Sequence, residues 1–366
     1  MIERMPSSLF DSFLSTPPIL VVCAGVAYLK ATGGSTTTKK KMAAVAAAAE
    51  AYSLWATLQK QDHSTSAAII SQLDGDADWK AFAAAQGDAI IARDNEDDEK
   101  LAAGIQIAVD AGVLPKQDVP PAYTKIDVLG KTPEDVCGVI SSAVGEAAGS
   151  GCIVVLCGLS GTGKGTTVEH LIKKTLPNAV SWSNGNIFRS LTLLAVTWCE
   201  QQQSDGEGAA FDADAALTAE NLETFMGMLS FGKFKGSYDI KIEGLGLDLL
   251  VGEVKNTVLK GKKVGSNIPT VAKVSQGHVV KFAAAALATM VSEGGHCVVL
   301  EGREATVNYV PTPYRFTLTM SDMTIIGKRR AAQVVAAAAL EKLKDAAAPS
   351  DEAVAAAIEE ALRECK

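Results

Sequence analysis

Five short segments along the chain have the apolar character of buried β-strands. Three of them, at 152–157, 296–300 and 314–320, are largely continuous apolar runs, which is typical of strands covered on both faces. The segments at 123–129 and 178–183 are shorter or alternate with polar residues. The pattern therefore predicts a sheet of five strands.

Stretches with helical spacing of apolar residues separate these strands. We expect helices at 133–148, 168–176, 184–203 and 278–291. Thr132, Pro133 and Asp135 suit the N-cap, N1 and N3 positions of the first of these helices. Strands that alternate with helices predict an α/β fold, in which a mostly parallel sheet carries helices on both faces.

The rest of the chain adds alanine-rich helices and one region of mixed pattern. Such helices are expected at 42–58, 78–92, 325–343 and 351–363. The charged run at 92–100 is interpreted as a solvated face, and 204–211 as a surface loop. Residues 236–275 alternate polar and apolar positions between glycines, which predicts short strands or a hairpin.

An apolar segment lies near the start of the sequence, at 17–29. It is shorter than the ~20 residues that a membrane-spanning helix needs. Glu3 and Asp11 precede it, which is unlike the basic flank of a targeting signal. A buried hydrophobic segment is therefore favoured over contact with a membrane. Residues 33–41, with glycines, threonines and lysines, are expected to form a flexible link.

Composition places the chain among soluble globular proteins. Of its 366 residues, 48% are apolar and 21% are charged. The net charge of −8 leaves no dominant basic face, so broad nucleic-acid binding is not expected. The seven cysteines include no CxxC pair, and the four histidines lack the spacing of a metal site. We expect reduced thiols in a reducing compartment, the cytoplasm first, with a plastid or mitochondrion as the alternative.

The segment most informative about chemistry follows the strand at 152–157. Residues 158–166 read GLSGTGKGT, and a helical pattern begins directly after them. Glycines let backbone N–H groups converge on phosphate oxygens, while Lys164 can reach the outer phosphates. The residues expected to bind phosphate are Gly158, Ser160, Gly161, Thr162, Gly163, Lys164, Gly165, Thr166 and Thr167. A phosphate loop is favoured over a plain glycine-rich turn because strand, spacing, lysine, hydroxyls and helix agree.

Two further polar segments follow predicted strands, at 183–189 and 301–304. Ligands of parallel sheets gather at the carboxyl ends of the strands. These two segments and the loop at 158–166 are therefore expected to share one edge of the sheet.

The order and spacing of these segments resemble the nucleoside monophosphate kinases, and the cytidylate kinases most closely. Residues 158–166 look like that family's GxSGxGKGT loop, in which glycine follows the lysine. Residues 183–189 (SNGNIFR) are similar to its DSGxxYR segment, and 301–304 (EGRE) to its (D/E)GRD turn. Residues 328–330 (KRR) resemble the basic start of its lid.

The resemblance implies transfer of a phosphoryl group from ATP to a nucleoside monophosphate. Lys164 and the loop amides would hold the ATP phosphates, and Thr166 and Glu301 would act on Mg²⁺. Arg189 and Arg303 would clamp the acceptor phosphate, because guanidinium forks match phosphate oxygens. Arg303 would also assist the transfer. The acceptor site would be completed by Ser183, Asn184 and Glu304.

The family's closing segments resemble the front of this chain. Residues 93–100 (RDNEDDEK) are similar to its RDxxDxxR lid segment, and 126–136 look like its last strand and helix. The resemblance thus implies a circularly permuted P-loop kinase, joined through the flexible link at 149–151. Its parts would be an alanine-rich helical extension (1–77), the lid end with last strand and last helix (78–148), and the kinase core (149–366). In the alternative, 78–148 completes the sheet of a neighbouring chain.

The lid would close over the transferring group. Its catalytic residues would be Arg93, Lys100, Arg329 and Arg330, and Asp97 would bind the acceptor ribose. Several positions depart from the family pattern. Ser183 and Asn184 stand where the family has Asp and Ser, Phe188 where it has Tyr, Glu304 where it has Asp, and Lys100 where it has Arg.

These departures leave three hypotheses open. The leading one is an ATP-dependent kinase of CMP or dCMP. The second is a catalytically weakened or inactive kinase-like subunit of a larger assembly, held through the N-terminal extension. The third, another P-loop kinase of small molecules, agrees less well with the GKGT sequence at 163–166.

Overall fold

The computed structural model describes residues 53–202 and 210–365. The predicted apolar segment at 17–29, the link at 33–41 and most of the helix at 42–58 lie outside these residues, as does most of the loop at 204–211. The chain divides into two compact units, one of residues 88–326 and one formed by residues up to 87 together with 327–366. Each unit is described by itself.

The larger unit is built around a five-stranded sheet whose strands are all parallel. Its order is β1-β8-β2-β7-β3. The strands are β1 (Thr124–Asp127), β2 (Cys152–Gly158), β3 (Ala179–Trp182), β7 (Cys297–Glu301) and β8 (Tyr314–Thr319). The expected α/β class with a mostly parallel five-stranded sheet is confirmed, and all five strands lie within the predicted segments to within one residue.

The central strand β2 has both faces covered, which explains its continuous apolar sequence. Side chains of a strand point alternately to opposite faces of the sheet. Accordingly Ile153 and Val155 belong to one hydrophobic core, whereas Val154 and Leu156 belong to another. Each of these four side chains is buried. The polar rim thus begins only at Gly158, where the strand ends.

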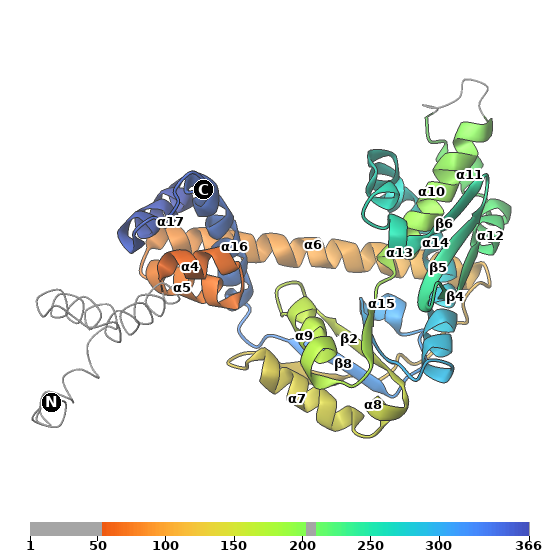
Figure 1. Cartoon of the computed structure of the whole chain (residues 1–366), viewed down its shortest axis with the longest axis horizontal. Helices are drawn as coiled ribbons and strands as arrows, with labels where there is room; N and C mark the ends of the chain where they lie inside the picture. The colour runs from red at the N-terminus through yellow and green to blue at the C-terminus, as the bar shows by residue number, and fades with distance from the viewer. Residues whose placement is uncertain (1–52, 203–209, 366) are drawn as a thin grey trace, which may run out of the picture. The chain divides into compact units, whose positions relative to one another are not determined.

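Two pairs of helices cover the two faces of the sheet. Helices α10 (Gly185–Gln202) and α14 (Lys262–Ser292) supply Leu191, Leu194 and Val279 to the core on one face. Helices α7 (Pro133–Val144) and α9 (Lys164–His170) supply Ile140 and Val168 to the core on the other face. In Figure 1, α7 and α9 lie beside β2 and β8. A π-helical turn, Leu171–Thr175, continues α9.

Strand β1 comes early in the chain but pairs with the last strand. It lies parallel to β8, from Thr124 opposite Phe316 to Asp127 opposite Thr319. Thr132 then caps α7, and the Asp135 side chain accepts a hydrogen bond from the Thr132 amide in return, so the predicted cap is confirmed. The expected flexible link at 149–151 is wrong in part, because residues 149 and 150 belong to the helical turn α8 (Ala147–Ser150).

A second, antiparallel sheet of three strands follows α10. Helices α11 (Ala213–Ala216) and α12 (Ala219–Gly227) lead into β4 (Leu229–Phe234), β5 (Ser237–Gly244) and β6 (Leu247–Leu250). Helix α13 (Val251–Val254) and the 3₁₀ turn Val258–Lys260 then lead into α14.

Short strands were expected over the whole of 236–275, and this is wrong beyond 250, because α14 begins at Lys262. Pro269 lies inside that helix. The packing of the buried Val264 and Val271 outweighs the local preference against a helix there.

The smaller unit is helical. It contains α4 (Leu54–Lys60), α5 (His63–Leu73), the first part of α6 (Ala77–Asp110), most of α16 (Thr324–Lys342) and α17 (Asp351–Cys365). Buried Trp79, Val335 and Ile358 lie in its core. Gly327 is required where α16 meets α6, since a Cβ there would lie 2.2 Å from the Ala83 carbonyl oxygen.

Helix α6 is longer than its sequence pattern predicts. We expected it to end near residue 92, before the charged run, but it continues unbroken to Asp110. An ion pair of 2.6 Å between Lys100 and Glu96, one turn apart, supports the helix within that run. The charged run at 92–100 is therefore helical. It belongs to the larger unit, which begins at residue 88.

Among the described residues, α14 alone is long and apolar enough to cross a membrane. Half of its most apolar window is buried inside the protein. Val271 and Val279 are fully buried in the core beneath the five-stranded sheet. These properties are equally those of a core helix in a soluble protein.

Candidate functional site

The turn after β2 is rich in glycine because its backbone adopts positive φ values and leaves no room for a Cβ at Gly158. Gly158 has φ +142°, and a Cβ placed on it would lie 2.5 Å from the carbonyl oxygen of Leu318 in strand β8. Gly161 and Gly163 adopt φ values of 84° and 89°, which disfavour other residues. The loop passes from the end of β2 to Gly163, the N-cap of α9.

Lys164 bridges the start of this loop. Its Nζ donates hydrogen bonds of 2.8 Å to the Gly158 carbonyl and 3.0 Å to the Leu159 carbonyl. Burial lowers the pKa of Lys164, an effect that the nearby carboxylate of Glu301 opposes. The ammonium group is thus held at the edge of the sheet by backbone oxygens that an incoming anion can replace.

The three threonine hydroxyls at 162, 166 and 167 differ in their accessibility. Thr162 Oγ1 donates 2.8 Å to the Leu159 carbonyl, and Thr167 Oγ1 donates 2.9 Å to the Gly163 carbonyl; both side chains are buried. Thr166, by contrast, is exposed on the first turn of α9. Of the three, Thr166 is the hydroxyl that a ligand can reach.

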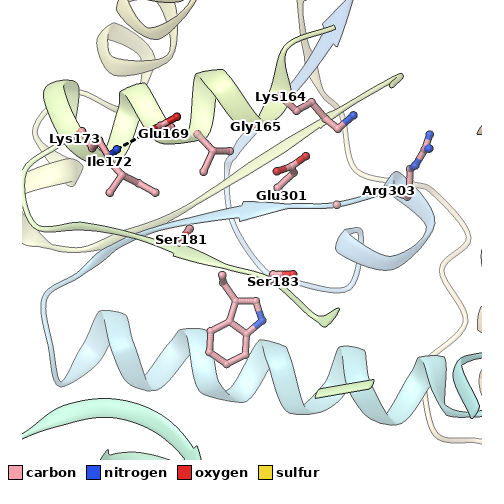
Figure 2. A pocket seen from close by; sticks show the side chains of 12 residues that line it. Lys164, Gly165, Glu169, Ile172, Lys173, Ser181, Ser183, Glu301 and Arg303 are labelled. Carbon is pink, nitrogen blue, oxygen red and sulfur yellow. Dashed lines mark hydrogen bonds and ion pairs between the residues drawn. The ribbon is translucent and has the colours of Figure 1, made fainter. Parts of the chain in front are cut away.

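A pocket of about 770 Å³ adjoins the loop at the carboxyl ends of β3 and β7. It is lined by Lys164, Gly165, Val168, Glu169, Ile172, Lys173, Ser181, Trp182, Ser183, Glu301, Gly302 and Arg303. Figure 2 shows Lys164, Glu301 and Arg303 at one end, and the ion pair of Glu169 with Lys173 at the other. The expectation that the three polar segments share one edge is confirmed, because each contributes a lining residue.

Arg303 is tied to helix α6 behind this pocket. Its Nη2 donates a 2.7 Å hydrogen bond to Oδ1 of Asp94, and its Nη1 lies 3.6 Å from Oδ1 of Asp98. Nη1 is buried and makes no hydrogen bond within the part of the chain that the structure describes. Both terminal nitrogens of the guanidinium thus face carboxylates of α6, Nη2 in a hydrogen bond and Nη1 in an ion pair.

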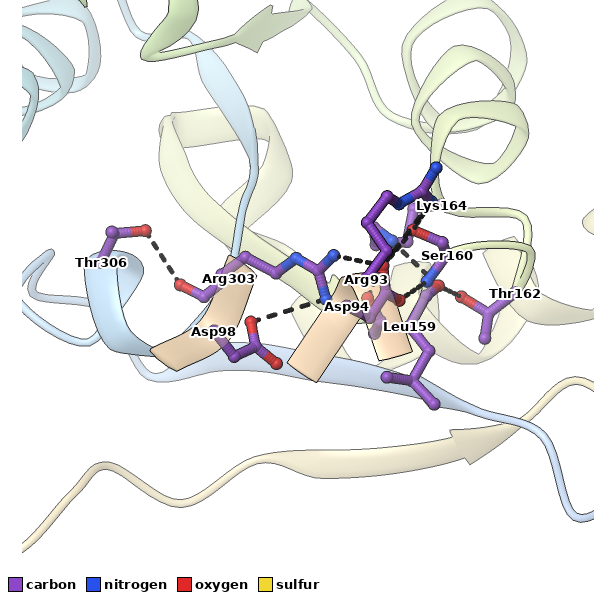
Figure 3. A network of polar contacts seen from close by, with 10 residues as sticks. Arg93, Asp94, Asp98, Leu159, Ser160, Thr162, Lys164, Arg303 and Thr306 are labelled. Atoms are coloured by element: carbon purple, nitrogen blue, oxygen red, sulfur yellow. Dashed lines mark hydrogen bonds and ion pairs between the residues drawn. The ribbon is translucent and has the colours of Figure 1, made fainter. Parts of the chain in front are cut away.

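Asp94 also holds the glycine-rich loop at 158–166. Its Oδ2 accepts a 2.6 Å hydrogen bond from the Ser160 amide, and its Oδ1 accepts one of 2.7 Å from Ser160 Oγ. Figure 3 shows its carboxylate between Ser160 and Arg303. Burial by itself would raise the pKa of Asp94, but the hydrogen bonds from Arg303 and Ser160 outweigh it and lower the pKa to about 2. The carboxylate is therefore ionised at neutral pH.

The segment predicted to hold the acceptor is only partly at the pocket. Ser183 lines it, whereas Asn184 Oδ1 accepts a 2.9 Å hydrogen bond from Trp182 Nε1. Arg189, half-buried on the first turns of α10, donates 3.3 Å to Asn186 and is not a lining residue. Glu304 is exposed at the start of the short helix α15 (Glu304–Val307), beside Arg303 in sequence.

The residues predicted for the lid are distributed between the two units. On α6, Arg93 donates 3.2 Å to Ser160 Oγ, Lys100 is paired with Glu96, and Asp97 is half-buried. Arg329 and Arg330 belong to the other unit, where Arg330 contacts Gln333. Of these residues, Arg93 contacts the glycine-rich loop at 158–166, through Ser160.

Sequence reasoning missed Asp94 and Trp182. In the described run 92–100, Asp94 is the buried residue, and it lies one helical turn after the buried Ile90. That spacing was the available signal, but the seven other charged and polar residues of the run obscured it. Trp182, which lines the pocket, was interpreted only as part of a strand.

The acidic and thiol groups of the described residues form no cluster of three or more that could bind a metal ion. Glu301 and the exposed Thr166 can still approach a Mg²⁺ ion that arrives with nucleotide phosphates. Compared with known proteins, the sequence matches no family model and no curated protein. The resemblance to nucleoside monophosphate kinases therefore rests on its short motifs.

Proposed function

We propose that this protein is an ATP-dependent kinase of nucleoside monophosphates, with CMP or dCMP as the acceptor. One observation carries the proposal: Lys164, Glu301 and Arg303 lie at one end of a single pocket beside a glycine-rich loop. Phosphoryl transfer requires mainly positioning and neutralisation of charge, for which two cations and a carboxylate at the ends of parallel strands are suited.

In this proposal the loop holds the donor. Lys164 exchanges its bonds to the Gly158 and Leu159 carbonyls for oxygens of the ATP phosphates. Glu301 would hold waters of the Mg²⁺ ion that accompanies ATP, and Thr166 would offer its exposed hydroxyl. The metal would neutralise charge on the phosphates. The residues present fit this task, because the desolvated Lys164 and the acidic Glu301 share one wall.

The acceptor phosphate is assigned to Arg303 and Ser183. Both line the pocket. Arg303 Nη1 is buried beside Asp98 at 3.6 Å and makes no hydrogen bond among the described residues, so a phosphate oxygen could take the place of Asp98 there. Arg189 reaches the phosphate only by leaving Asn186. The preference for a cytosine base rests on the motif resemblance at 158–166, 183–189 and 301–304.

A circular permutation is part of the proposal. The parallel pairing of β1 with β8 supports it, since a strand from before the phosphate loop completes the sheet of the same chain. Asp94 on α6 supports it further, because this early helix supplies a residue that contacts the loop. We propose cytoplasmic activity on free nucleotides, without a nucleic-acid partner.

A coupled assay of ADP formation tests the function. ATP·Mg²⁺ is supplied with CMP, dCMP, UMP or AMP in turn, and a reaction without acceptor measures ATP hydrolysis. We expect turnover to depend on the acceptor and to be fastest with CMP or dCMP. Folded protein that produces ADP at the acceptor-free rate with all four nucleotides overturns the proposal.

A second candidate is a kinase-like subunit without catalysis, and a specific observation favours it. Asp94 already supplies an anion to Arg303 and to the Ser160 amide, and Lys100 is ion-paired with Glu96. Titration calorimetry with ATP·Mg²⁺ distinguishes the two. Co-purification with a large assembly together with absent ATP binding supports the subunit, whereas ATP binding that Lys164→Ala removes supports the kinase.

A further inference from the structure

We propose that Asp94 is a positioning residue for phosphoryl transfer: its carboxylate joins the phosphate loop to Arg303, so that the donor and acceptor sites are set in one geometry. The proposal rests on the proposed function. It concerns a residue of helix α6, which lies 66 positions before its loop partner and 209 before its arginine partner.

The first argument is the number and direction of the hydrogen bonds. Both oxygens of Asp94 are used, with Ser160 donating from its amide and hydroxyl and Arg303 donating from Nη2, at 2.6–2.7 Å. Bonds to a carboxylate of this length are charge-assisted and among the strongest in proteins. A single side chain therefore fixes two groups that come from different strand ends.

The second argument is where Asp94 lies relative to the pocket. Its side chain is 1% exposed, while that of Arg303 is 19% exposed and lines the pocket. Asp94 is not a lining residue. It thus holds Arg303 without itself lining the pocket, as a supporting residue does.

The third argument is the anchoring of α6 itself. Ile90, one turn before Asp94, is buried in the core that also contains Val154 and Leu156 of the central strand. The carboxylate is therefore attached to a helix packed on the sheet rather than to a mobile surface segment. Displacements of about 1 Å at a reacting group can cost about 100-fold in rate, so such support has a measurable effect.

Replacement of Asp94 by the neutral isostere Asn tests this role. Asp94→Asn keeps an oxygen that can accept from Ser160 but loses the charge that orients Arg303. We expect kcat/KM for the acceptor monophosphate to fall about 100-fold, while the KM for ATP·Mg²⁺ changes less than about threefold. A merely structural role would instead lower the amount of folded enzyme and affect both nucleotides alike.

Asp88→Asn is the matched control, because Asp88 is an exposed carboxylate on the same helix and in the same unit. It should leave both constants at their wild-type values. The wild-type enzyme is assayed first, and its failure to turn over any monophosphate overturns the proposed function and this inference together. Wild-type turnover that Asp94→Asn leaves within twofold, or an acceptor KM that decreases in that variant, overturns the inference alone.

A measurement on the unmodified chain covers the case in which Asp94→Asn does not fold. NMR of the arginine side chains, assigned for Arg303 by comparison with Arg303→Lys, reports rotation of the guanidinium group. Because Nη2 is held by a buried carboxylate, we expect slow rotation for Arg303 and fast rotation for the exposed Arg363. Fast rotation of Arg303 contradicts the proposed support.

Discussion

Arg303 and Asp94 are joined by a 2.7 Å hydrogen bond between Nη2 and Oδ1, although 209 residues separate them in the sequence. Arg303 follows strand β7, and Asp94 lies on α6, before the first strand of the sheet. The contact therefore depends on the folded arrangement of the larger unit.

Acid should weaken the protein partly through Asp94. Its folded pKa of about 2 lies below the ordinary value of 3.8, so the ionised group stabilises the fold above about pH 4. That contribution of about 2 kcal/mol is lost as the pH falls from about 4 to about 2. Denaturant titrations at several pH values should show a shallower acid dependence for Asp94→Asn. Asp88→Asn should follow the wild type, and equal slopes for Asp94→Asn and wild type would contradict the assignment.

Lys164→Ala should abolish most of the phosphoryl transfer. The side chain brings a cation to the pocket next to the loop, and removing a preorganised positive donor costs about 100- to 1000-fold in rate. The coupled assay measures kcat with a saturating acceptor. Lys174→Ala is the control, since Lys174 is an exposed lysine beyond α9 that does not line the pocket. Equal activity of the two variants would remove Lys164 from the mechanism.

Gly158→Ala should destabilise the larger unit by about 2–3 kcal/mol. A Cβ at this position would meet the Leu318 carbonyl oxygen at 2.5 Å, and the residue's φ of +142° adds strain. Gly165→Ala is a matched change seven residues later, in a helix with no heavy atom within 4 Å of the new Cβ. It should raise the free energy of unfolding by about 0.5–1 kcal/mol. Urea denaturation measures both, and equal effects would contradict the loop geometry.

Thiol reagents should distinguish Cys365 from the other cysteines of the described residues. Cys365 is half-buried, whereas Cys137, Cys152, Cys157, Cys199 and Cys297 are buried. Burial raises the pKa of Cys137 to about 11 and of Cys157 to about 12, so little reactive thiolate forms at neutral pH. Peptide mapping after brief iodoacetamide treatment of the native protein should find Cys365 modified first. Denatured protein, as the control, should be modified at all six, and rapid native labelling of Cys157 would refute the prediction.

Much of the sheet could be predicted from sequence, because continuous apolar runs identify its central strands. Residues 152–157 and 296–300 contain no face that can meet water, and a strand between two helical layers is the arrangement that hides them. The cap at Thr132 was equally readable, since its side-chain chemistry is local. The shared edge of three polar segments followed from the parallel topology.

The site was less predictable, because its key contacts are between distant segments. In the sequence, only the position one helical turn after Ile90 separates Asp94 from Asp97 and Asp98 in a run of acidic residues. Asp94 is buried and Asp98 is exposed because of the rotation of α6 about its axis. That rotation is set by Ile90, which packs into the core. Likewise, the start of α14 at Lys262 is determined by packing against α10, which outweighs the glycine and proline signals in its own sequence.

The pairing of β1 with β8 has a consequence for synthesis of the protein. Thr124 has its partner at Phe316, so β1 leaves the ribosome long before the strand that will accept its hydrogen bonds. At ~5–20 residues per second the interval is roughly 10–40 s. During that time the backbone groups of β1 have no partner strand. Because β8 lies between β1 and β2 in the sheet, β1 can join the sheet only after β8 has been synthesised. A variant truncated before residue 314 should therefore leave β1 without its partner strand, and we expect it to bind chaperones more strongly than the full chain does.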